Sequence, residues 1–494
     1  MSSHWRRSAI PMIALVIAGC TASTQAPTTP VSSTTTTAPT TTTTTLPDCT
    51  PVEAEAPAAI AGEDATAISI ALAGLRYPCA NEAIVTADTP AAITAGAALG
   101  LEDGQPVLVD GPGVTDELDR LGVRAVRWVG LAPAPPFGVA TTVLAPSEIT
   151  DTIPTPEDDD GDSVWVLGSD PDAAPLLTAV AAARGEVFVD VTEADDLRAL
   201  DSETLRTLQS GAAVAVGLDE DRQWQLEVVR GATELPGGGF TFDGKRLVAF
   251  YGNPTTSALG VLGEQDPAGT LERLGPLVED YSADGLQGIP TFEIIATVAS
   301  ASAGADNDYS EEAGLDTLRP WIEFAGENGI YVVLDLQPGR TDFLTQAQRY
   351  EEFLRLPHVG LALDPEWRLT PDQVHLRQIG TVDAAEINQV SAWLRDIVRE
   401  ERLPQKYFLI HQFRFSMITN RDLIETPTEL FTVIQMDGQG PLPTKYETYS
   451  AITEGQEAVG WAWGWKNFYD EDSPMGTPAE VLAVRPVVVF VSFQ

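Results

Sequence analysis

The stretch VGLALDPEWR, Val359 to Arg368, joins an apolar run to two carboxylates, Asp364 and Glu366, that stand two residues apart. Successive side chains of a strand point to opposite faces, so the small residues of the run share a face with both carboxylates, and its leucines take the other. Small residues suit the crowded interior of a closed barrel, and leucines suit the layer between strands and helices. The stretch therefore predicts a barrel strand that ends on two inward-pointing acids.

Similar apolar runs recur through residues 245–494. Eight can be counted, namely RLVAFYG, GIPTFEIIA, GIYVVLDLQ, VGLALDPEW, KYFLIHQF, LFTVIQMDG, AVGWAWGW and RPVVVFVSF. Amphipathic helical patterns such as AAEINQVSAWLRDIVREE lie between them, so we expect strand and helix to alternate throughout. This order predicts a (β/α)8 TIM-like barrel, with an open α/β sheet as the alternative. The sequence ends on the eighth run, so we expect the preceding region or the linker to cover the flank of that strand.

Residues 48–233 form a separate region, bounded by the Gly/Pro-rich segment ELPGGGFTFDGK (Glu234–Lys245). Within it, Ala83–Gly130 lines up loosely with Val164–Leu200 and the following GAAVAVG. Each copy has the pattern strand, Ala-rich helix, strand, helix, strand, which predicts a Rossmann-like α/β repeat domain. No GxGxxG follows the first strand, so we expect no nucleotide site and no cofactor.

The first 20 residues have the pattern of an export signal, with two arginines, a short apolar run and small residues before Cys20. The ending IAGC resembles the lipobox of bacterial lipoproteins, and this resemblance implies a lipid anchor at Cys20; a plain signal peptide is the alternative. Residues 21–47 are a Thr/Pro-rich tract with almost no large apolar side chain, which predicts a disordered stalk. The expected location is the outer face of the cell membrane, with the stalk reaching into the cell wall.

Two cysteines remain, Cys49 and Cys79, and in an exported protein we expect them to form a disulfide, with free thiols as the alternative. The chain has 29 basic and 72 acidic residues, and its formal net charge is −43. Nucleic acids and anionic lipid surfaces would be repelled by such a chain, so neither is expected as a partner.

The chemistry of such barrels collects where the strands end, because the strand-to-helix loops converge there. We therefore expect Asp364 and Glu366 to lie in the mouth of the barrel, with their Cα atoms roughly 6 to 7 Å apart. Two carboxyls so close cannot both ionise freely in a partly dry pocket, so one should have a raised pKa. The alternative is a salt-bridge network with Arg340, Arg368 or Arg414.

Several families of barrel glycoside hydrolases carry Asp-x-Glu at the end of the fourth strand, and DPEW resembles this motif. The resemblance implies that Glu366 is the general acid and that Asp364 orients it or stabilises charge. A base or nucleophile would come from another strand end, and the candidates are Asp335, Glu293 and Asp437.

Aromatic and polar residues at the strand ends predict sugar binding, because flat rings can stack on sugars and polar tips can bind hydroxyl groups. The candidates are Tyr251, Trp367, His411, Arg414, Trp465, Lys466 and Asn467. Three tryptophans of WAWGW alternate at strand spacing, which favours a packed core face instead, and a lone His such as His411 is more often a scaffold residue. No His or Cys cluster, GxSxG elbow or ligand-spaced loop is present, so we expect no metal site and no serine nucleophile.

The repeat region resembles the cell-wall-binding repeat 2 modules of Gram-positive bacteria, where a strand ending in small and acidic residues leads into an Ala-rich helix. That resemblance implies attachment to the wall; a purely structural α/β domain is the alternative. As a whole, the chain resembles envelope lipoproteins of the high-GC Gram-positive type, which implies no particular activity.

Together these features predict a membrane-anchored lipoprotein whose glycoside-hydrolase-like barrel acts on a wall or capsule polysaccharide. The alternative is a non-catalytic cell-wall-binding or scaffold lipoprotein. A third carboxylate across the cleft from Glu366 would separate the two hypotheses.

Overall fold

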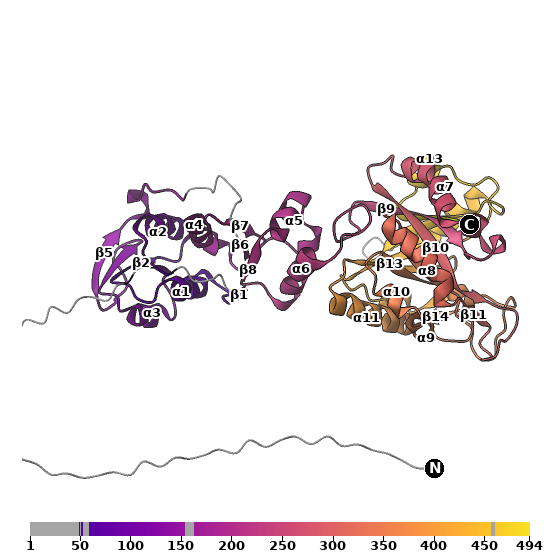
Figure 1. Ribbon diagram of the computed structural model, residues 1–494, viewed down its shortest axis with the longest axis horizontal. Helices are drawn as coiled ribbons and strands as arrows, with labels where there is room; N and C mark the ends of the chain where they lie inside the picture. Colours follow the sequence, from indigo (N-terminus) through magenta and orange to yellow (C-terminus); the bar gives the residue numbers. More distant parts are fainter. Residues whose placement is uncertain (1–48, 50, 53–58, 154–162, 456–459) are drawn as a thin grey trace, which may run out of the picture. The chain divides into compact units, whose positions relative to one another are not determined.

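The computed structural model describes residues 49, 51–52, 59–153, 163–455 and 460–494 (Figure 1). Cys49–Gln494 form one compact unit. The predicted export signal, the lipidation site Cys20 and the Thr/Pro-rich stalk lie outside the described residues. None of the described helices is long and apolar enough to cross a membrane.

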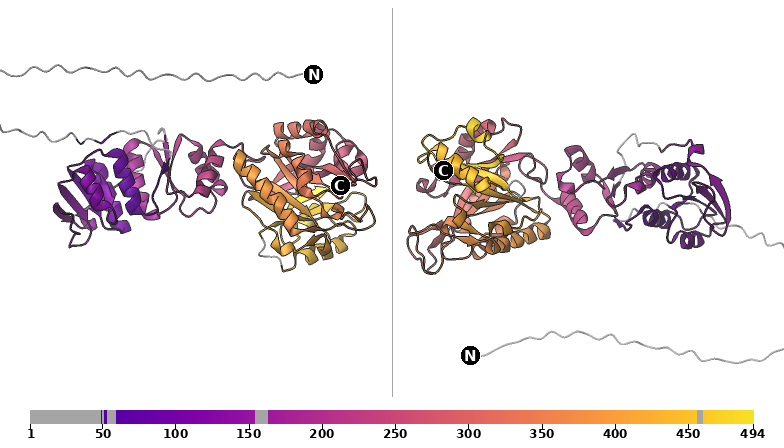
Figure 2. Two further views of the ribbon diagram at one scale, coloured as in Figure 1. Left: turned by 90° about the horizontal axis from the view of Figure 1, so that it is seen from below. Right: turned by 180° about the vertical axis from the view of Figure 1, so that it is seen from behind.

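The C-terminal region is a closed barrel of eight parallel strands (Figures 1 and 2). In order around the barrel they are β9 (Lys245–Gly252), β10 (Gln287–Ala299), β12 (Tyr331–Leu336), β13 (Val359–Leu363), β15 (Lys406–His411), β17 (Leu430–Met436), β18 (Ala462–Asn467) and β19 (Val488–Phe493). β19 pairs in parallel with β9 and closes the ring. The predicted TIM-like barrel is confirmed, and the open sheet is wrong. A short antiparallel strand, β11 (Ser310–Glu312), is added beside β10.

Helices follow most of the barrel strands. They are α7 (Pro267–Asp280), α8 (Leu315–Glu327), α9 (Phe343–Gln348), α10 (Glu351–Leu354), α11 (Ala384–Glu401), α12 (Leu442–Thr453) and α13 (Pro478–Leu482). The expectation of a helix after every strand is wrong between β15 and β17. That connection, described throughout, holds the 3-10 turns η7 (Phe415–Met417) and η8 (Arg421–Leu423) and strand β16 (Ile418–Thr419) instead of an α-helix. β16 pairs with β14 (Val382–Asp383), so this loop is tied to the one after β13.

The alternation predicted for the fourth strand is confirmed. Ala362 packs in the barrel interior, whereas Leu361 and Leu363 belong to the outer core between strands and helices. A Cβ atom on Gly360 would lie only 2.6 Å from the carbonyl oxygen of Tyr407, so this interior position has no room for a side chain.

The segment Glu234–Lys245 is part of the core rather than a simple linker, because Phe242 closes the lower end of the barrel. The side chain of Phe242 is 2% exposed. Its ring makes edge-to-face contacts with Tyr331 and Tyr407 at centroid distances of 5.2 and 4.9 Å. Two residues earlier, Phe240 packs in a core of the preceding region.

The outer side of β19 is covered by rings of the barrel region itself. Phe493 contacts Tyr281 at 5.9 Å and Tyr469 at 5.8 Å between ring centroids. The expectation that the preceding region or the linker covers this flank is therefore wrong, because the linker residue Phe242 is used at the barrel's end.

Two four-stranded parallel sheets form the N-terminal region (Figure 1). The first has the order β3-β2-β4-β5, with β2 (Glu82–Thr86), β3 (Val107–Val109), β4 (Ala125–Val129) and β5 (Ala140–Leu144). The second has the order β1-β8-β6-β7, with β1 (Ala59–Ile60), β6 (Ser163–Leu167), β7 (Val187–Asp190) and β8 (Ala212–Val216). β1 precedes the first sheet in the chain but pairs with β8 of the second.

Each sheet contains one strand-helix-strand-helix-strand unit with the same strand order, second-first-third. The helices are α2 (Pro90–Asp103) and α3 (Val114–Leu121) in one unit, and α4 (Ala174–Arg184) and α5 (Ser202–Gln209) in the other. The element order expected for both copies is therefore present. α1 (Ala65–Arg76), α2 and α4 share one apolar core with the second sheet, and α6 (Glu220–Gly231) follows β8.

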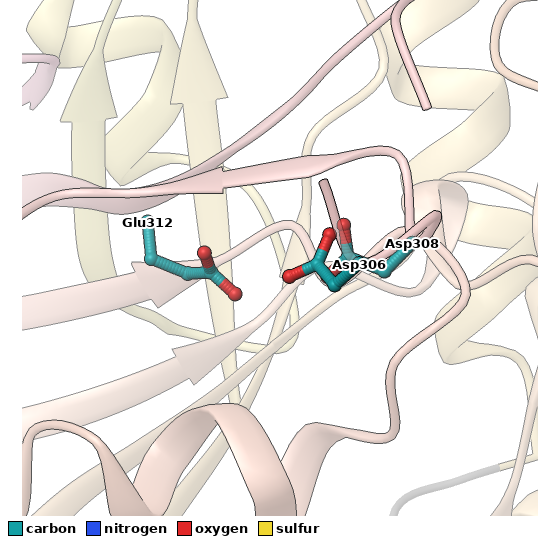
Figure 3. Close-up of side chains that lie close together, drawn as sticks. All are labelled: Asp306, Asp308 and Glu312. Carbon is teal, nitrogen blue, oxygen red and sulfur yellow. The ribbon is translucent and has the colours of Figure 1, made fainter. Parts of the chain in front are cut away.

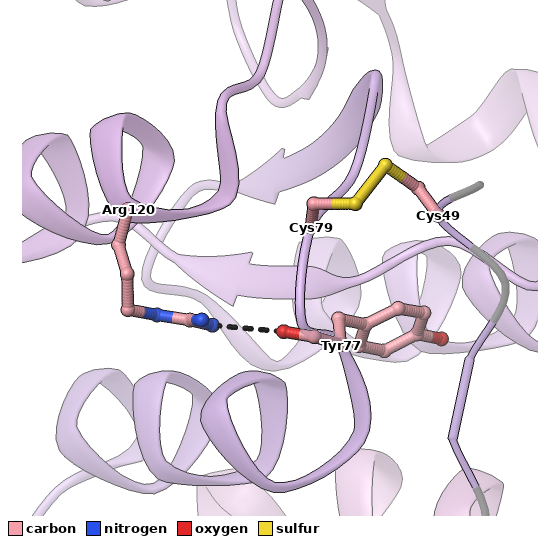
Figure 4. The surroundings of a disulfide bond; sticks show 4 residues. All are labelled: Cys49, Tyr77, Cys79 and Arg120. Atoms are coloured by element: carbon pink, nitrogen blue, oxygen red, sulfur yellow. Dashed lines mark hydrogen bonds between the residues drawn. A yellow bond between two sulfur atoms is a disulfide. The ribbon is translucent and has the colours of Figure 1, made fainter. Parts of the chain in front are cut away.

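A disulfide joins Cys49 to Cys79, which stand 30 residues apart, as the sequence predicted (Figure 4). It links the start of the described chain to the turn between α1 and β2. Beside it, Arg120 Nη2 donates a hydrogen bond of 3.1 Å to the carbonyl oxygen of Tyr77, which fixes the same turn from α3.

Candidate functional site

A cleft with an empty volume of about 1260 Å³ lies where the barrel strands end. Its walls combine carboxylates, amides, cations and aromatic rings from six of the strand-to-helix connections and the chain's end. The main lining residues are Tyr251, Gln337, Asp364, Glu366, Trp367, Phe413, Arg414, Asp437, Gln439, Lys466, Phe468 and Glu471. Most of the polar strand ends of the sequence therefore converge on one place, as expected for this fold.

The acid pair of the fourth strand reaches this cleft. Asp364 follows β13 directly and is 3% exposed. Glu366 lies in the next element, the 3-10 turn η6 (Pro365–Trp367), so strand alternation ends at Asp364. The backbone N–H of Gly380 donates a 2.6 Å hydrogen bond to the carbonyl oxygen of Glu366, which holds the loop after β13 against this turn.

Asp437, the residue after β17, supplies a third carboxylate. One oxygen from each of Asp364, Glu366 and Asp437 lies within 4.8 Å of the others. In the barrel, β17 is separated from β13 only by β15, so Asp437 approaches the acid pair from a neighbouring part of the rim. Asp437, one of the three candidates for the base or nucleophile, thus lies beside Glu366. Three such oxygens could also hold a hard divalent cation, for which carboxylates are the preferred ligands.

His411, at the end of β15, lies beneath these acids and is fully buried. Its Nδ1 is 3.2 Å from Oδ2 of Asp437, and its Nε2 is 3.3 Å from Oε1 of Glu293 and 3.5 Å from Oδ1 of Asp335. Burial lowers the pKa of His411, whereas the hydrogen bonds with the three carboxylates raise it. The carboxylates have the larger effect, and the net pKa is well above the usual range. This shift favours the charged imidazolium, and His411, one of the predicted substrate-binding residues, is not among the residues that line the cleft.

Glu293 and Asp335 are also fully buried and do not line the cleft. The structure therefore does not bring these two candidates for the base or nucleophile to the cleft. Asp335 instead accepts a 2.9 Å hydrogen bond from the hydroxyl of Tyr251, whose ring does line the cleft. Burial and then Asp335 raise the pKa of Tyr251 well above its usual value, so the phenol remains a donor.

The pKa values of Asp364 and Glu366 are both raised, whereas the sequence predicted a raised pKa for only one of them. Burial raises the pKa of Asp364 well above its usual value, and Glu366 adds to the effect. Burial, followed by the charge of Asp437, raises the pKa of Glu366 to about 7, although Lys466 opposes the change. The side chain of Glu366 is thus suited to give up a proton near neutral pH.

The alternative salt-bridge network is absent among the described residues. Arg368 pairs with Glu386 at 2.9 Å, and Arg340 donates its hydrogen bonds to a backbone carbonyl. Arg414 is exposed at the rim of the cleft. Neither member of the acid pair therefore has an arginine partner.

Trp465 and Asn467, two predicted substrate-binding residues of β18, do not line the cleft. Trp465 is fully buried in the outer core, and its Nε1 donates a 2.9 Å hydrogen bond to Oδ1 of Asn467, which is also fully buried. Both alternate with Lys466, so only Lys466 faces the interior. The packed tryptophan face is confirmed, since Trp461 and Trp463 belong to the same core.

Sequence reasoning missed several walls of the cleft. The rings of Phe413 and Phe468 and the carboxylate of Glu471 all line it. The two phenylalanines directly follow the polar ends of β15 and β18, and this adjacency is the signal that could have identified them. Trp367, one of the predicted substrate-binding residues, lines the cleft, and its ring packs against that of His375 at a centroid distance of 4.6 Å.

A second group of carboxylates lies in the loop that leads into β11. Asp306, Asp308 and Glu312 each place one oxygen within 4.8 Å of the others (Figure 3). Asp308 accepts hydrogen bonds from a backbone N–H and a threonine hydroxyl, and Glu312 pairs with Arg349 at 3.2 Å. Asp308 and Glu312 therefore have structural partners within the protein.

A search of protein families finds no model that matches the chain, and a search of curated proteins finds no match either. The geometry of the cleft is therefore the basis on which a function can be assigned.

Proposed function

We propose that the barrel is a glycoside hydrolase of the retaining type, with Glu366 as general acid and base and Asp437 as nucleophile. The observation that carries the proposal is the approach of Asp364, Glu366 and Asp437, one oxygen of each within 4.8 Å of the others, in the cleft at the strand ends. A pair of carboxylates beside the bond to be broken is the machinery that most glycosidases use.

The spacing of the carboxylates supports retention. The two catalytic carboxyls of retaining enzymes are about 5 to 5.5 Å apart, and those of inverting enzymes are about 6.5 to 9.5 Å apart to leave room for a water molecule. A separation of no more than 4.8 Å between the nearest oxygens of Glu366 and Asp437 fits the shorter spacing.

In the first step, protonated Glu366 gives its proton to the glycosidic oxygen while Asp437 bonds to the anomeric carbon, and the bond to the leaving sugar breaks. In the second step, Glu366 takes a proton from water, whose oxygen displaces Asp437 and restores both carboxyls. A pKa of about 7 suits Glu366 to both tasks. Nδ1 of His411 lies 3.2 Å from Oδ2 of Asp437, so the ring is directed at the carboxylate of the nucleophile.

The other cleft residues fit a sugar. The rings of Trp367, Phe413 and Phe468 offer flat apolar surfaces, and the amides of Gln337 and Gln439 can bind hydroxyl groups. Asp364 takes no separate step in this scheme. Its raised pKa makes it a neutral neighbour that can donate a hydrogen bond to Glu366 or to the substrate.

We also propose that the enzyme acts on a wall or capsule polysaccharide, held at the outer face of the membrane by a lipid on Cys20. The support is the IAGC ending and the Thr/Pro-rich tract of the sequence. For residues 48–233 we propose a Rossmann-like repeat domain that binds wall polymer. Its two units share the second-first-third strand order with which flavodoxin-like doubly wound sheets begin.

The test uses the compact unit Cys49–Gln494 with purified wall and capsule polysaccharides, and mass spectrometry of the released products. Glu366→Gln should lower release by about a hundredfold or more, yet retain activity on aryl glycosides whose leaving group needs no proton. Asp437→Asn should abolish cleavage of both substrates. Glu327→Gln, which changes an exposed carboxylate at the end of α8 that does not line the cleft, is the matched control and should cleave normally.

Proton NMR of the first-formed product should show the anomeric configuration of the substrate. Inversion would rule out Asp437 as nucleophile. If the parent releases nothing from any polymer but still sediments with wall material, the barrel is a binding or scaffold protein.

A further inference from the structure

Lys466 differs from the other lysines of the chain. The sequence contains four, and three of them donate hydrogen bonds to backbone carbonyl groups: Lys245, Lys406 and Lys445. The fourth, Lys466, is 4% exposed and lines the cleft. Within the described parts of the chain, no carboxylate or hydrogen-bond acceptor pairs with its Nζ.

Its contacts are aromatic. Nζ lies 3.4 Å from the ring centroid of Tyr251 and 5.3 Å from that of Phe468. Cation–π contacts stabilise an ammonium by about 0.5 to 2 kcal/mol, but a ring face does not satisfy three N–H donors. A largely buried ammonium is costly unless it is paired, so this arrangement is suited to an acceptor brought by a ligand.

The position of Lys466 in the cleft limits the kinds of ligand that it can bind. Its charge acts on Glu366, since it opposes the rise in the pKa of that carboxyl, so a group bound by Lys466 belongs to the sugar beside the catalytic pair. A second cation, Arg414, stands at the exposed rim of the same cleft. A single carboxylate carries one charge and needs one cation, whereas a dianionic phosphate would place two charges beside the acids of the cleft.

We propose that Lys466 binds a carboxylate on the sugar unit in the cleft, so that the substrate is a glycan carrying uronic acids or carboxyalkyl ethers. This rests on the proposed function only in taking the cleft as a glycan site. The net charge of −43 does not oppose it, because at physiological ionic strength a charge acts over about 8 Å and the ligand meets Lys466 directly.

The test is binding, measured by calorimetry on Glu366→Gln in the Cys49–Gln494 unit so that no glycan is consumed. Two probes are used, an oligosaccharide of uronic acids and one with lactyl ethers, each beside its carboxyl-reduced form. We expect at least one acidic probe to bind ten times or more tightly than its reduced form. Lys466→Met added to Glu366→Gln should remove that difference, and Lys466→Arg should keep part of it.

Lys245→Met is the matched control, because its Nζ donates to the carbonyl of Thr241 and it is absent from the cleft lining. Circular dichroism and melting temperature show whether each variant is folded. The proposal is overturned if acidic and reduced probes bind equally, if Lys466→Met keeps the preference, or if no probe binds.

Failure of this proposal is distinct from failure of the hydrolase. Glycan release without any preference for carboxylates would leave the enzyme and remove the role of Lys466. Binding that depends on both carboxylate and Lys466, with no release by the parent, would leave the acidic-glycan site and remove the catalysis.

Discussion

The Nδ1 atom of His411 lies 3.2 Å from Oδ2 of Asp437, so a buried cation lies directly below the nucleophile that we propose. The other ring nitrogen faces Glu293 and Asp335. Both nitrogens of the ring are therefore directed at carboxylates, and neither is free to accept a proton from a substrate. His411 sets the charge of the site from below rather than taking part in a reaction.

This arrangement predicts that His411 remains an imidazolium at pH 7.5. Hydrogen bonds with three carboxylates outweigh burial and raise its pKa, whereas burial lowers the pKa of His358, which has one backbone partner. Burial also lowers the pKa of His375, so nitrogen-15 NMR of the Cys49–Gln494 unit should show one charged ring and two neutral rings at this pH. A neutral His411 would mean that burial outweighs the effect of the three carboxylates on its pKa.

Glu366→Gln should stabilise the protein at alkaline pH. The pKa of Glu366 is about 7 in the folded protein, against an ordinary value of 4.5, so the stability contributed by its protonated form is complete below about pH 4.5 and is lost as the pH rises through 7. A glutamine does not ionise, and we expect a gain of about 1 to 3 kcal/mol at pH 8.5 and little at pH 4.5. Urea unfolding at both values measures it; an equal effect at both would contradict the shifted pKa.

Phe242→Ala should open the lower end of the barrel. The ring is 2% exposed and packs edge-on against Tyr331 and Tyr407, so its loss should cost about 3 to 5 kcal/mol of unfolding free energy. Leu131→Ala is the control, because Leu131 is 84% exposed and its loss should cost less than about 0.5 kcal/mol. Similar midpoints for the two variants in urea would show that the barrel does not need this ring.

Gly360→Ala should destabilise the barrel by about 1 to 3 kcal/mol, because the added Cβ would lie 2.6 Å from the carbonyl oxygen of Tyr407. Gly74→Ala makes the same change in helix α1, where no atom lies within 4 Å of the added group. That variant should be neutral or more stable by about 0.5 to 1 kcal/mol. Both variants add the same methyl group, so thermal unfolding separates the cost of crowding at Gly360 from the gain in backbone entropy at Gly74.

Removal of the disulfide with Cys49→Ser and Cys79→Ser should lower stability by about 3 to 4 kcal/mol, because the bond closes a loop with a separation of 30 residues. Urea unfolding of the double variant and of the parent, with and without dithiothreitol, measures the loss. Reductant should affect only the parent; a parent that does not respond would mean that the two thiols are free.

The sequence was sufficient for the barrel, because buried parallel strands are nearly continuous apolar runs and all eight were visible. It was also sufficient to direct Asp364 inward, since the period of two is strict within β13. The helix expected after β15 is absent, because the residues between β15 and β17 carry no apolar repeat at helical spacing. The helix was expected only because the fold usually has one after each strand, and the residues of this segment did not support it.

The site was harder to predict, because an inward-pointing side chain reaches the cleft only if it lies near the end of its strand. Glu293 and Asp335 point inward as expected, but they end below the cleft, and the stagger of neighbouring strands sets this depth. Trp465 and Asn467 could have been excluded from parity alone, since both alternate with Lys466. Asp437 could only be named as one candidate among three until closure of the ring brought β17 near β13.

Strand β1 makes the folding of the second N-terminal sheet depend on residues that precede the first sheet in the chain. Ala59 and Ile60 lie next to Ala215 and Val216, although more than 100 residues of the other sheet and the following chain separate them. During synthesis, the edge of the second sheet therefore leaves the ribosome before the first sheet exists and must wait for β8. A cut between the two repeats would leave one fragment with an orphaned strand and the other with an exposed sheet edge. The two repeats thus fold as an interlocked pair, and a gene fragment that encodes either one alone should yield an aggregation-prone product.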